Sequence, residues 1–552
     1  MSRLRSFFRT SAVATRPQAR PRLLIDLSPP QLGLHSTPAS KQKRHQSTSP
    51  PPQGLPKPDG SRPLQKAKGF AKKELEALVD YYGLELDTRP DPDLEDDGDL
   101  VWNVGDKHEP WPLHNAADVE HVRRLERLLQ DDEAPHDMVY EVYKKLPAPG
   151  VVYLRLSTIR CMLHHLSIVE RPTPAAMQRF LAILDDMKTA HIHIITSEWT
   201  SAIYLTGRAM GKVTAYDLHS AISLWQDMEQ RAGLKSTYVT LNVLFNIAVK
   251  ANEFALAETF LQIMKTRKIK MHRHHRSSLI FYYGVKQDGN AVRRAYQNMI
   301  NCGDVIDTSI MNSVIAALIR AGEASPAEHV FERMKRLHAT RRISAPGHRF
   351  FTHAWRDRRS LGIFLTYEGR RLTKTNEPDK LKQLQEFAPI APDTHTYAIL
   401  IRYHASTAGN IDRVKELLRE MRLNSLPLNG TIFIVIFYGF NSFGGVRYSS
   451  WTPSELEKFY AQYIKALKEK LEGTWLSCLA VLATLRAFSR VSGRERTVEV
   501  WQELRSLWDP SEDELEEVLM ALRKLAPAGW LEIVRNQASE GSGFFDEWPS
   551  RE

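Results

Sequence analysis

The stretch YVTLNVLFNIAVKANEFALAETFLQIMKTRKIKMH, from Tyr238 to His272, decides the fold. Its apolar residues fall at helical spacing in two runs, one through Leu241 and Leu244 and the other through Phe260 and Met264. An Ala-Asn pair separates the runs and a basic turn ends the second, which predicts two short amphipathic helices joined by a tight turn. One such hairpin cannot bury both of its faces, so it must stack against neighbours.

The same pattern recurs along the middle of the chain. Residues 273–307 and 308–342 align with the first unit without a gap, and Asn312 stands where Asn242 stood. Weaker copies flank these three units, at Val151–Ile195, Thr196–Ser236, His395–Asn429 and Gly430 to about Lys470. Residues 151–470 are therefore expected to form an all-α solenoid of helix–turn–helix units. The best units are 238–272, 273–307, 308–342 and 395–429.

The segments outside the regular units are harder to assign. Residues 343–392 are either a degenerate repeat or an insertion. Thr452 with Glu455, and Ser511 with Glu514, have the spacing of a capping box, which predicts a helix start at each. The other predicted parts are a transit peptide with a disordered leader at 1–62, N-terminal helices with an acidic linker at 63–150, capping helices at 471–537 and a disordered tail at 538–552.

The charge of the chain is unevenly distributed. The 552 residues carry a formal net charge of +10, but ten Lys/Arg and a single acid lie in the first 58 residues. This opening is Arg- and Ser-rich and amphipathic, and it lacks a long apolar stretch, which is typical of a mitochondrial transit peptide. A basic tail that binds nucleic acid directly is the alternative. Three scattered cysteines predict no disulfide framework, and no apolar run is long enough for a membrane span.

The three central units share further positions. The turn pattern is Lys or Arg, then Ala, then Gly or Asn, as in 250–252 and 320–322, and the second helix carries an alanine, an aromatic residue or Leu, and then Met. With Asn242 and Asn312 near the start of the first helix, this pattern resembles the pentatricopeptide family, strongly over 238–342 and loosely on either side. The tetratricopeptide family has a similar period, but its W-x₂-L-G-x₂-Y signature is missing from these units.

The resemblance implies which residues would read RNA. In this family each repeat addresses one nucleotide, chiefly through its fifth and last residues. The implied pairs are Asn242 with His272, Ser277 with Asp307, Asn312 with Arg342, and Ala398 with Asn429. Only Ser277 with Asp307 is a common family pair, so the chain is a poor candidate for reading out a sequence code. The second residues of the units, which in the family pack between bases, are Val239, His274 and Ser309.

Basic residues gather in the same units. Residues 238–342 hold sixteen Lys/Arg against eight Asp/Glu, many of them at the junctions between units. Such residues can neutralise phosphates, which gives salt-dependent affinity for nucleic acid. The predicted phosphate contacts are Lys268, Lys270, Arg273, Arg276 and Arg341, with Val239 and His274 as stacking residues. Arg356, Arg358 and Arg359 beside Trp355 form a second stacking surface or the exposed side of an ordinary helix.

No motif of catalysis or cofactor binding is found in the sequence. His272, His274 and His275 lack partner Cys or acid ligands and lie among arginines, so no metal site is predicted. The expected function is non-enzymatic: binding of single-stranded mitochondrial mRNA or rRNA in transcript stability, processing or translation, in the matrix and without a small-molecule substrate or cofactor. The alternative is a protein-binding scaffold whose partners are the mitoribosome or respiratory-complex assembly factors.

Overall fold

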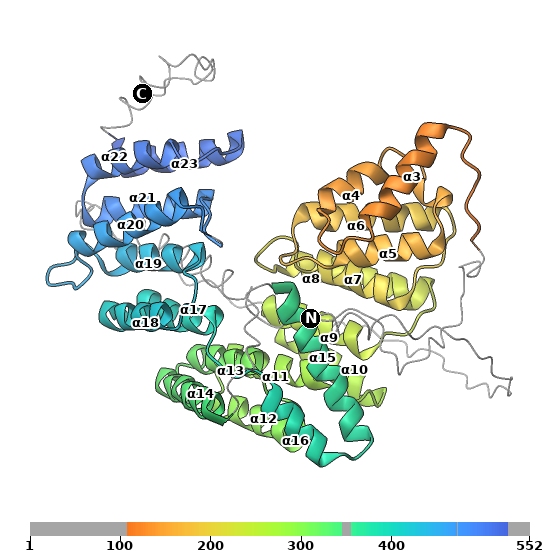
Figure 1. Ribbon diagram of the computed structural model, residues 1–552, viewed down its shortest axis with the longest axis horizontal. Coiled ribbons are helices and arrows are strands. Elements are labelled where there is room, and N and C mark those ends of the chain that lie inside the picture. Colours follow the sequence, from red (N-terminus) through yellow and green to blue (C-terminus); the bar gives the residue numbers. More distant parts are fainter. Residues whose placement is uncertain (1–107, 345–354, 472, 528–552) are drawn as a thin grey trace, which may run out of the picture. The chain divides into compact units, whose positions relative to one another are not determined.

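The computed structural model describes residues 108–344, 355–471 and 473–527, and these residues form helices and connecting turns without a strand (Figure 1). All of them belong to one of the chain's two units, Ser61–Glu552. The predicted leader at 1–62, the first part of the predicted N-terminal segment, 63–107, and the tail lie outside the described residues. Within the described part, no helix is both long and apolar enough to span a bilayer.

The helices alternate between first and second members of hairpins. The first members are α5 (Leu156–Ser167), α7 (Thr196–Thr206), α9 (Tyr238–Lys250), α11 (Arg273–Val285), α13 (Thr308–Arg320), α17 (Thr394–Tyr403), α19 (Gly430–Phe443) and α21 (Cys478–Val491). The second members are α6 (Pro174–Thr189), α8 (Ala215–Gln226), α10 (Phe254–Thr266), α12 (Gly289–Asn301), α14 (Ala324–Ser344), α18 (Ile411–Leu423), α20 (Pro453–Lys468) and α22 (Arg494–Arg505). Helices α3 (Ala116–Leu128) and α4 (His136–Tyr143) precede the hairpins, and α23 (Glu512–Leu525) follows them.

Each first helix packs against the first helix of the next hairpin, from α5 through α21 to α23. This succession is the predicted all-α solenoid. It does not end near residue 470, where the sequence suggested a change to capping helices, because α21 packs on α19 as the earlier first helices pack on one another. The hairpin α21–α22 therefore continues the stack, and only α23 is left without a following partner among the described residues.

The turns inside the central units follow one rule. Residues Asn252, Gln287 and Gly322, at the same position of three successive units, all have a positive φ of 60° to 81°. A left-handed residue at this point ends the first helix and lets the second begin two or three residues later. The junction turns use the same device, with Lys268 at φ 53° where the next unit has Gly303 at 74°.

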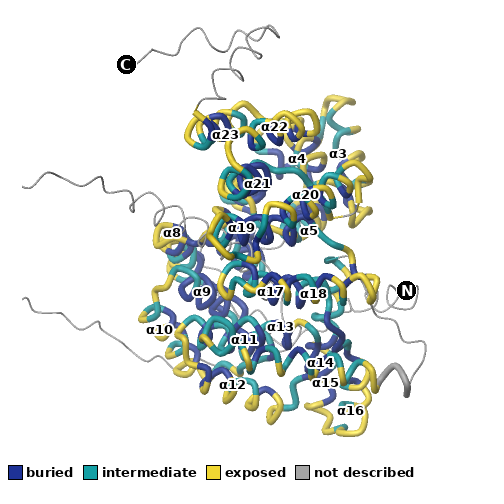
Figure 2. The backbone as a smooth tube through the Cα atoms, turned by 90° about the vertical axis from the view of Figure 1, so that its left-hand side faces the viewer, coloured by how far each residue is buried: buried dark blue, intermediate teal, exposed yellow. Residues whose placement is uncertain are grey.

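The core lies between the paired helices. In α10 and α14 the alanine, phenylalanine and methionine that mark the repeat are at most 1% exposed, as in Phe260, Met264, Phe331 and Met334. Figure 2 shows α9 and α19 as mostly buried, whereas the turns around α12 and α16 are exposed. These apolar side chains recur at the same positions of successive units, and their burial supplies the main stabilisation of the stack.

Residues 343–392 are an insertion and not a degenerate repeat. Helix α14 runs to Ser344, and α15 (Trp355–Lys374) and α16 (Pro378–Phe387) then form a hairpin of their own. Helix α13 packs directly against α17, so the α15–α16 hairpin does not stand between consecutive units. It packs instead on the loop between α12 and α13, through a small apolar cluster of Val305, Leu365, Leu372, Leu384 and Ala388.

Candidate nucleic-acid interface

The fifth residues of the first helices form a buried row. In three places the fifth residue of one first helix meets the third residue of the next. Thr200 Oγ1 lies 2.8 Å from Thr240 Oγ1, and Thr396 donates to Asn312 over 2.7 Å. Asn242 meets His275 in the same way. Two of the predicted base-reading residues, Asn242 and Asn312, therefore serve as polar contacts between units. All four predicted fifth residues, in α9, α11, α13 and α17, are 0–6% exposed.

Asn242 is held by two neighbours. Its Oδ1 lies 2.9 Å from His275 Nδ1, and Asn246 Nδ2 donates to its main-chain carbonyl over 2.9 Å. Burial, and next the charge of Arg276, lower the pKa of His275 to about 4, so its ring is neutral at pH 7. A neutral imidazole carries one N–H, and the short Nδ1 to Oδ1 contact places that proton on Nδ1. His275 is therefore a structural partner of Asn242.

Ser277 and Ser278 are adjacent, both 0% exposed, and differ in their partners. Ser278 Oγ donates to the His274 carbonyl over 2.9 Å and accepts from Asn246 Nδ2 over 2.8 Å. Ser277 Oγ has no hydrogen-bond partner among the described residues, because the next helix presents Ile310 at the third position. The one typical base-reading hydroxyl of the chain is thus buried and unsatisfied.

We expect Ser277→Ala to leave the free energy of unfolding unchanged or to raise it by up to about 1 kcal/mol, because a buried hydroxyl without a partner is costly. Ser278→Ala is the matched control, and it should lower the free energy of unfolding by about 1–2 kcal/mol, since it leaves the Asn246 amide short of an acceptor. Urea denaturation followed by circular dichroism measures both. Equal losses for the two serines would show that Ser277 has a partner in solution.

Asn312 pairs with Asp393. The sequence register placed Arg342 in the turn after the third unit, but Arg342 lies inside α14, whose last turn extends to Ser344. The insertion postpones the junction to Asp393, which caps α17 and accepts a hydrogen bond from Asn312 Nδ2 over 3.1 Å. Asp393 is the last residue of this unit in three dimensions. Its capping pattern with Thr396 is the local signal that could have found it.

The Asp393 carboxylate stays charged. Burial acts to raise its pKa, but hydrogen bonds from His395, from the Thr396 amide and from Asn312 outweigh burial and hold the pKa well below its usual range. About a quarter of the side chain remains exposed. The junction between α13 and α17 therefore presents a carboxylate beside an amide, with one edge toward solvent.

The downstream pair is chemically poorer. Helix α17 begins at Thr394, one residue before the predicted unit, and this places Ala398 at the fifth position, where it is 3% exposed. Asn429 caps α19 by accepting the Ile432 amide over 3.1 Å. A methyl group and a capping amide offer little to distinguish one base from another.

Two predicted phosphate contacts turn out to be internal ion pairs. Arg273, which is 4% exposed, pairs with Asp307 over 2.6 Å and donates to the Val305 carbonyl over 2.8 Å. Asp307 also caps α13 through the Ile310 amide. Arg276 forms a two-pronged ion pair with Asp304, with Nη2 2.7 Å from Oδ1. These arginines bind the junction of the units together, so they are not available to phosphates.

The exposed cations lie elsewhere. Lys268 and Lys270 are exposed on the turn after α10, beside the exposed Lys265. Arg267 in the same turn is engaged by Glu229, with the closest N to O distance 2.6 Å. The side chain of Arg341, like that of Arg342, lies outside the described residues.

Sequence reasoning missed basic residues at the far ends of the first helices. Lys250 is the last residue of α9 and Arg320 the last of α13, at the same position of their units. Both cations contact the Phe281 ring of α11, at 5.7 and 4.7 Å from its centroid. Cations at helix C-termini are also favoured by the helix dipole. In the sequence, this cluster could have been found only by noting that Lys250 and Arg320 occupy the same position of their units.

The start of α11 and α9 is covered by the inserted hairpin. His272 is the N-terminal cap position of α11, and its ring centroid lies 4.3 Å from that of Tyr238. His274 Nε2 lies 3.2 Å from Thr366 Oγ1 of α15. Val239, the predicted stacking residue, is only 6% exposed. The predicted stacking surface is therefore closed in this conformation.

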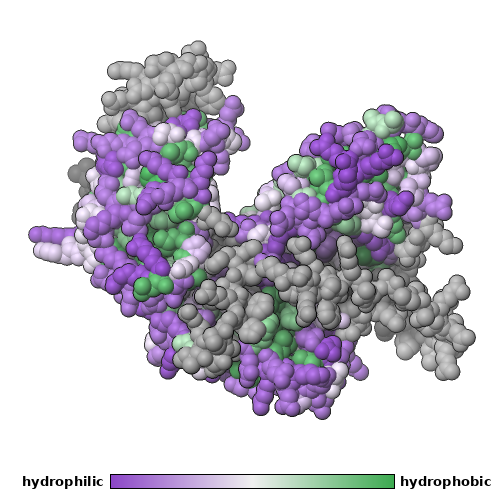
Figure 3. Space-filling model, in the orientation of Figure 1, coloured by the Kyte–Doolittle hydropathy of each residue, from purple (hydrophilic) through white to green (hydrophobic). Residues whose placement is uncertain are grey.

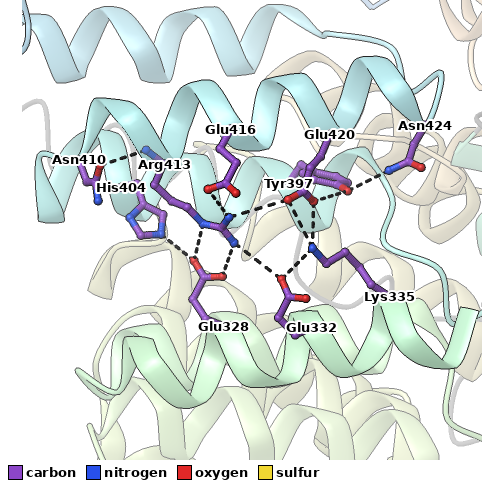
Figure 4. A network of polar contacts seen from close by, with 10 residues as sticks. All are labelled: Glu328, Glu332, Lys335, Tyr397, His404, Asn410, Arg413, Glu416, Glu420 and Asn424. Carbon is purple, nitrogen blue, oxygen red and sulfur yellow. Dashed lines mark hydrogen bonds and ion pairs between the residues drawn. The ribbon is translucent and has the colours of Figure 1, made fainter. Parts of the chain in front are cut away.

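The second helices carry a separate charged cluster (Figure 4). Arg413 of α18 reaches Glu328 of α14 over 2.8 Å and Glu416 over 2.7 Å, while Lys335 of α14 reaches Glu420 over 3.2 Å. These ion pairs join the hairpin before the insertion to the hairpin after it. Their role is to hold α14 and α18 together, on the helices opposite the row of fifth residues.

Among the described residues, no group of three His, Cys, Asp or Glu is arranged to hold a metal ion. What the geometry defines is a protein built from stacked helical hairpins, with polar residues at the contacts between first helices and basic residues at the turns and helix ends. The chain is thus an α-solenoid protein.

Comparison with known protein families identifies one of the units. Residues 309–338, which lie in α13 and α14, match the model of the pentatricopeptide repeat, so this hairpin is a repeat of that type. A search of curated proteins gave no match.

Three solved structures of low identity are similar to parts of the chain. The maize pentatricopeptide repeat protein PPR10 is 14% identical over 72% of this chain and 54% of its own, with a TM-score of 0.30. PPR10 bound to an 18-nucleotide psaJ RNA element is 14% identical over 78% of this chain and 61% of its own, at 0.27. Yeast Rmd9p bound to a 16-nucleotide target RNA is 11% identical over 77% and 94%, at 0.35. The chain spans about half the length of the first of these.

Proposed function

We propose that this protein binds single-stranded RNA in the mitochondrial matrix and acts without catalysis on the stability, processing or translation of organellar transcripts. The observation that carries the proposal is the junction of Asn312 with Asp393 in the unit that matches the family model. An amide and a charged carboxylate side by side present donors and acceptors that suit the edge of a base. Repeats of this family address one base per unit.

Binding would require the Asn312 to Asp393 contact to open. Asn312 is 6% exposed, whereas the Asp393 side chain is about one-quarter exposed, so a base edge would reach Asp393 first. The exposed lysines of the turn after α10 would supply contacts to the RNA backbone. With eight hairpins in the described stack, the site would accommodate about eight nucleotides at most.

The location of the protein rests on its opening sequence, which lies outside the described residues. Its Arg-rich, acid-poor composition supports import into mitochondria. The test is a fusion of residues 1–62 to a fluorescent protein. Matrix targeting that is lost when Arg3, Arg5 and Arg9 become Gln supports the proposal, and a cytosolic fusion contradicts it.

The second candidate function is a protein-binding scaffold of the mitoribosome or of respiratory-complex assembly. It is favoured by the burial of the fifth residues and by Ala398, which cannot pair with a base. On the face drawn in Figure 3, hydrophobic patches are interspersed with hydrophilic residues over the helices from α17 to α23. Purification of the protein from mitochondria under native conditions, with and without ribonuclease, separates the two functions.

We expect Asn312→Ala to weaken binding to the preferred RNA by about tenfold, since one correctly read base contributes roughly 1–3 kcal/mol. Asn246→Ala is the matched control, because Asn246 is an equally buried amide that bonds only within and between helices. The measurement is fluorescence anisotropy with RNA selected from a random pool, repeated between 50 and 200 mM KCl, as salt should weaken binding steeply. If selection enriches no RNA, or if both variants bind equally, the proposed function is wrong.

A further inference from the structure

The inserted hairpin lies on the N-terminal ends of α9 and α11. Arg273 Nη1 donates to the Gly362 carbonyl over 3.3 Å and to Thr366 Oγ1 over 3.2 Å. Thr366 Oγ1 also lies 3.2 Å from His274 Nε2. Arg370, four residues further along α15, lies over the Tyr238 ring at 5.8 Å. Helix α15 thus engages Tyr238, the first residue of one unit, and Arg273 and His274, the first two residues of the next.

The α15–α16 hairpin is held on the stack by a small apolar contact. Its buried cluster contains five residues, of which Val305 belongs to the stack and Leu365, Leu372, Leu384 and Ala388 to the hairpin or the segment that follows it. Gln385 adds a pair of hydrogen bonds to the main chain of Ile306, each 2.7 Å. A unit that buries so few side chains opens at a much lower free energy than the whole fold.

The net charges of α15 and of the unit beneath it also disfavour their contact. Helix α15 contains six Lys/Arg and two Asp/Glu, and the unit 273–307 on which it lies contains five Lys/Arg and three Asp/Glu. Both partners are therefore net basic, and their approach is disfavoured at long range. A polyanion between or beside them would relieve this repulsion, whereas a neutral or cationic ligand would not.

We propose that the α15–α16 hairpin masks the ends of α9 and α11, where the predicted RNA-binding residues His272 and His274 lie beside Tyr238, and that it thereby regulates the binding of single-stranded RNA. This inference rests on the proposed function. Histidine and tyrosine rings provide stacking platforms for unpaired bases, and the freed α15 contributes cations for phosphates. The hairpin and the RNA compete for the same face, so the affinity depends on the fraction of molecules in which the hairpin is displaced.

Two glycines of α15 provide a matched test. A Cβ on Gly369 would lie 3.2 Å from Val305 Cγ2, at the contact with the stack, whereas a Cβ on Gly362 would meet nothing within 4 Å. Gly369→Leu should loosen the hairpin and raise RNA affinity about tenfold if it shifts a mostly closed population to an open one. Gly362→Leu makes the same change in helix propensity and should leave the affinity unchanged.

An engineered disulfide that fixes the hairpin on the stack tests the same proposal, because it should lower RNA affinity instead of raising it. Val305→Cys with Gly369→Cys, in a Cys302→Ser background, places two cysteines across the contact between stack and hairpin. Oxidation should lower RNA affinity below that of the reduced protein, and a reductant should restore it. The masking proposal is wrong if the oxidised and reduced forms bind RNA equally and the two leucine variants also bind equally. If the wild-type protein still binds RNA in that case, the proposed function stands. Absence of RNA binding in the wild-type protein overturns both.

Discussion

Replacing Gly284 by alanine should lower the free energy of unfolding by about 2 kcal/mol, although an alanine normally stabilises the interior of a helix. Gly284 lies in α11 where it packs on α13, and an added Cβ would lie 2.6 Å from Ala317 Cα and 2.7 Å from Ala317 Cβ. Atoms of a main chain cannot rotate away, so the two helices must separate.

Gly289→Ala is the control for this change. An added Cβ there would clash only with the carboxylate end of Glu323, which is a flexible side chain. Glu323 is paired with Arg293 at the surface, and loss of such an exposed pair costs little. We expect Gly289→Ala to be neutral within about 1 kcal/mol. Guanidinium denaturation distinguishes the two, and equal midpoints would show that α11 and α13 are not in close contact in solution.

Removing the cation at the centre of Figure 4 should have the largest electrostatic effect. Arg413 lies within 4.0 Å of four carboxylates, those of Glu328, Glu332, Glu416 and Glu420. Arg413→Met would leave Glu332 and Glu420 paired with Lys335, and Glu328 paired with His404. We expect a loss of about 2–3 kcal/mol in the free energy of unfolding, at the low end for a broken ion-pair network because the cluster is partly exposed. Arg419→Met, an exposed arginine on the same helix, is the control and should be neutral.

Acid titration distinguishes lost attraction from lost packing. Burial acts to raise the pKa of Glu328, but hydrogen bonds from His404 and Arg413 outweigh it and hold the pKa at about 2. A carboxyl with a depressed pKa stabilises the fold above its unfolded value of 4.5, and this contribution disappears as the pH falls toward 2. The wild type should therefore lose stability over this range. In Arg413→Met, protonation relieves the repulsion, so the difference between the two proteins should shrink. A constant difference across the range would assign the effect to packing alone.

The regular part of the fold was predictable because each unit repeats the same local chemistry. The alanine, aromatic and methionine positions of α10 and α14 are buried as expected, and Ser511 with Glu514 forms the predicted capping box. The other pattern correctly predicts the helix start at Thr452, the N-cap of α20, but the capping hydrogen bonds do not form. Glu455 does not reach back to the start of α20, because Lys415 and Lys458 bind its two oxygens at 3.0 and 2.9 Å. Competition from another helix is not visible in a four-residue pattern.

The candidate site was less predictable for a related reason. The positions of the fifth residues were known from the repeat, but whether they face a ligand or the next helix depends on the residue opposite them, such as His275 or Thr396. Arg342 was placed in a turn because a fixed unit length was assumed, and the insertion moves that turn to Asp393. Arg273 and Arg276 were counted as cations for RNA. An acid 34 residues after Arg273 and another 28 residues after Arg276 neutralise them.

The direct packing of α13 on α17 also makes this protein open to engineering. Since the chain leaves the stack after α14 and returns at the start of α17, the intervening segment can change in length without altering any contact between units. The entropic cost of closing such an excursion grows by only about 0.6 kcal/mol for each doubling of its length. A fluorescent reporter or an additional folded module could therefore be grafted at this point, with the helices on both sides left in their native order.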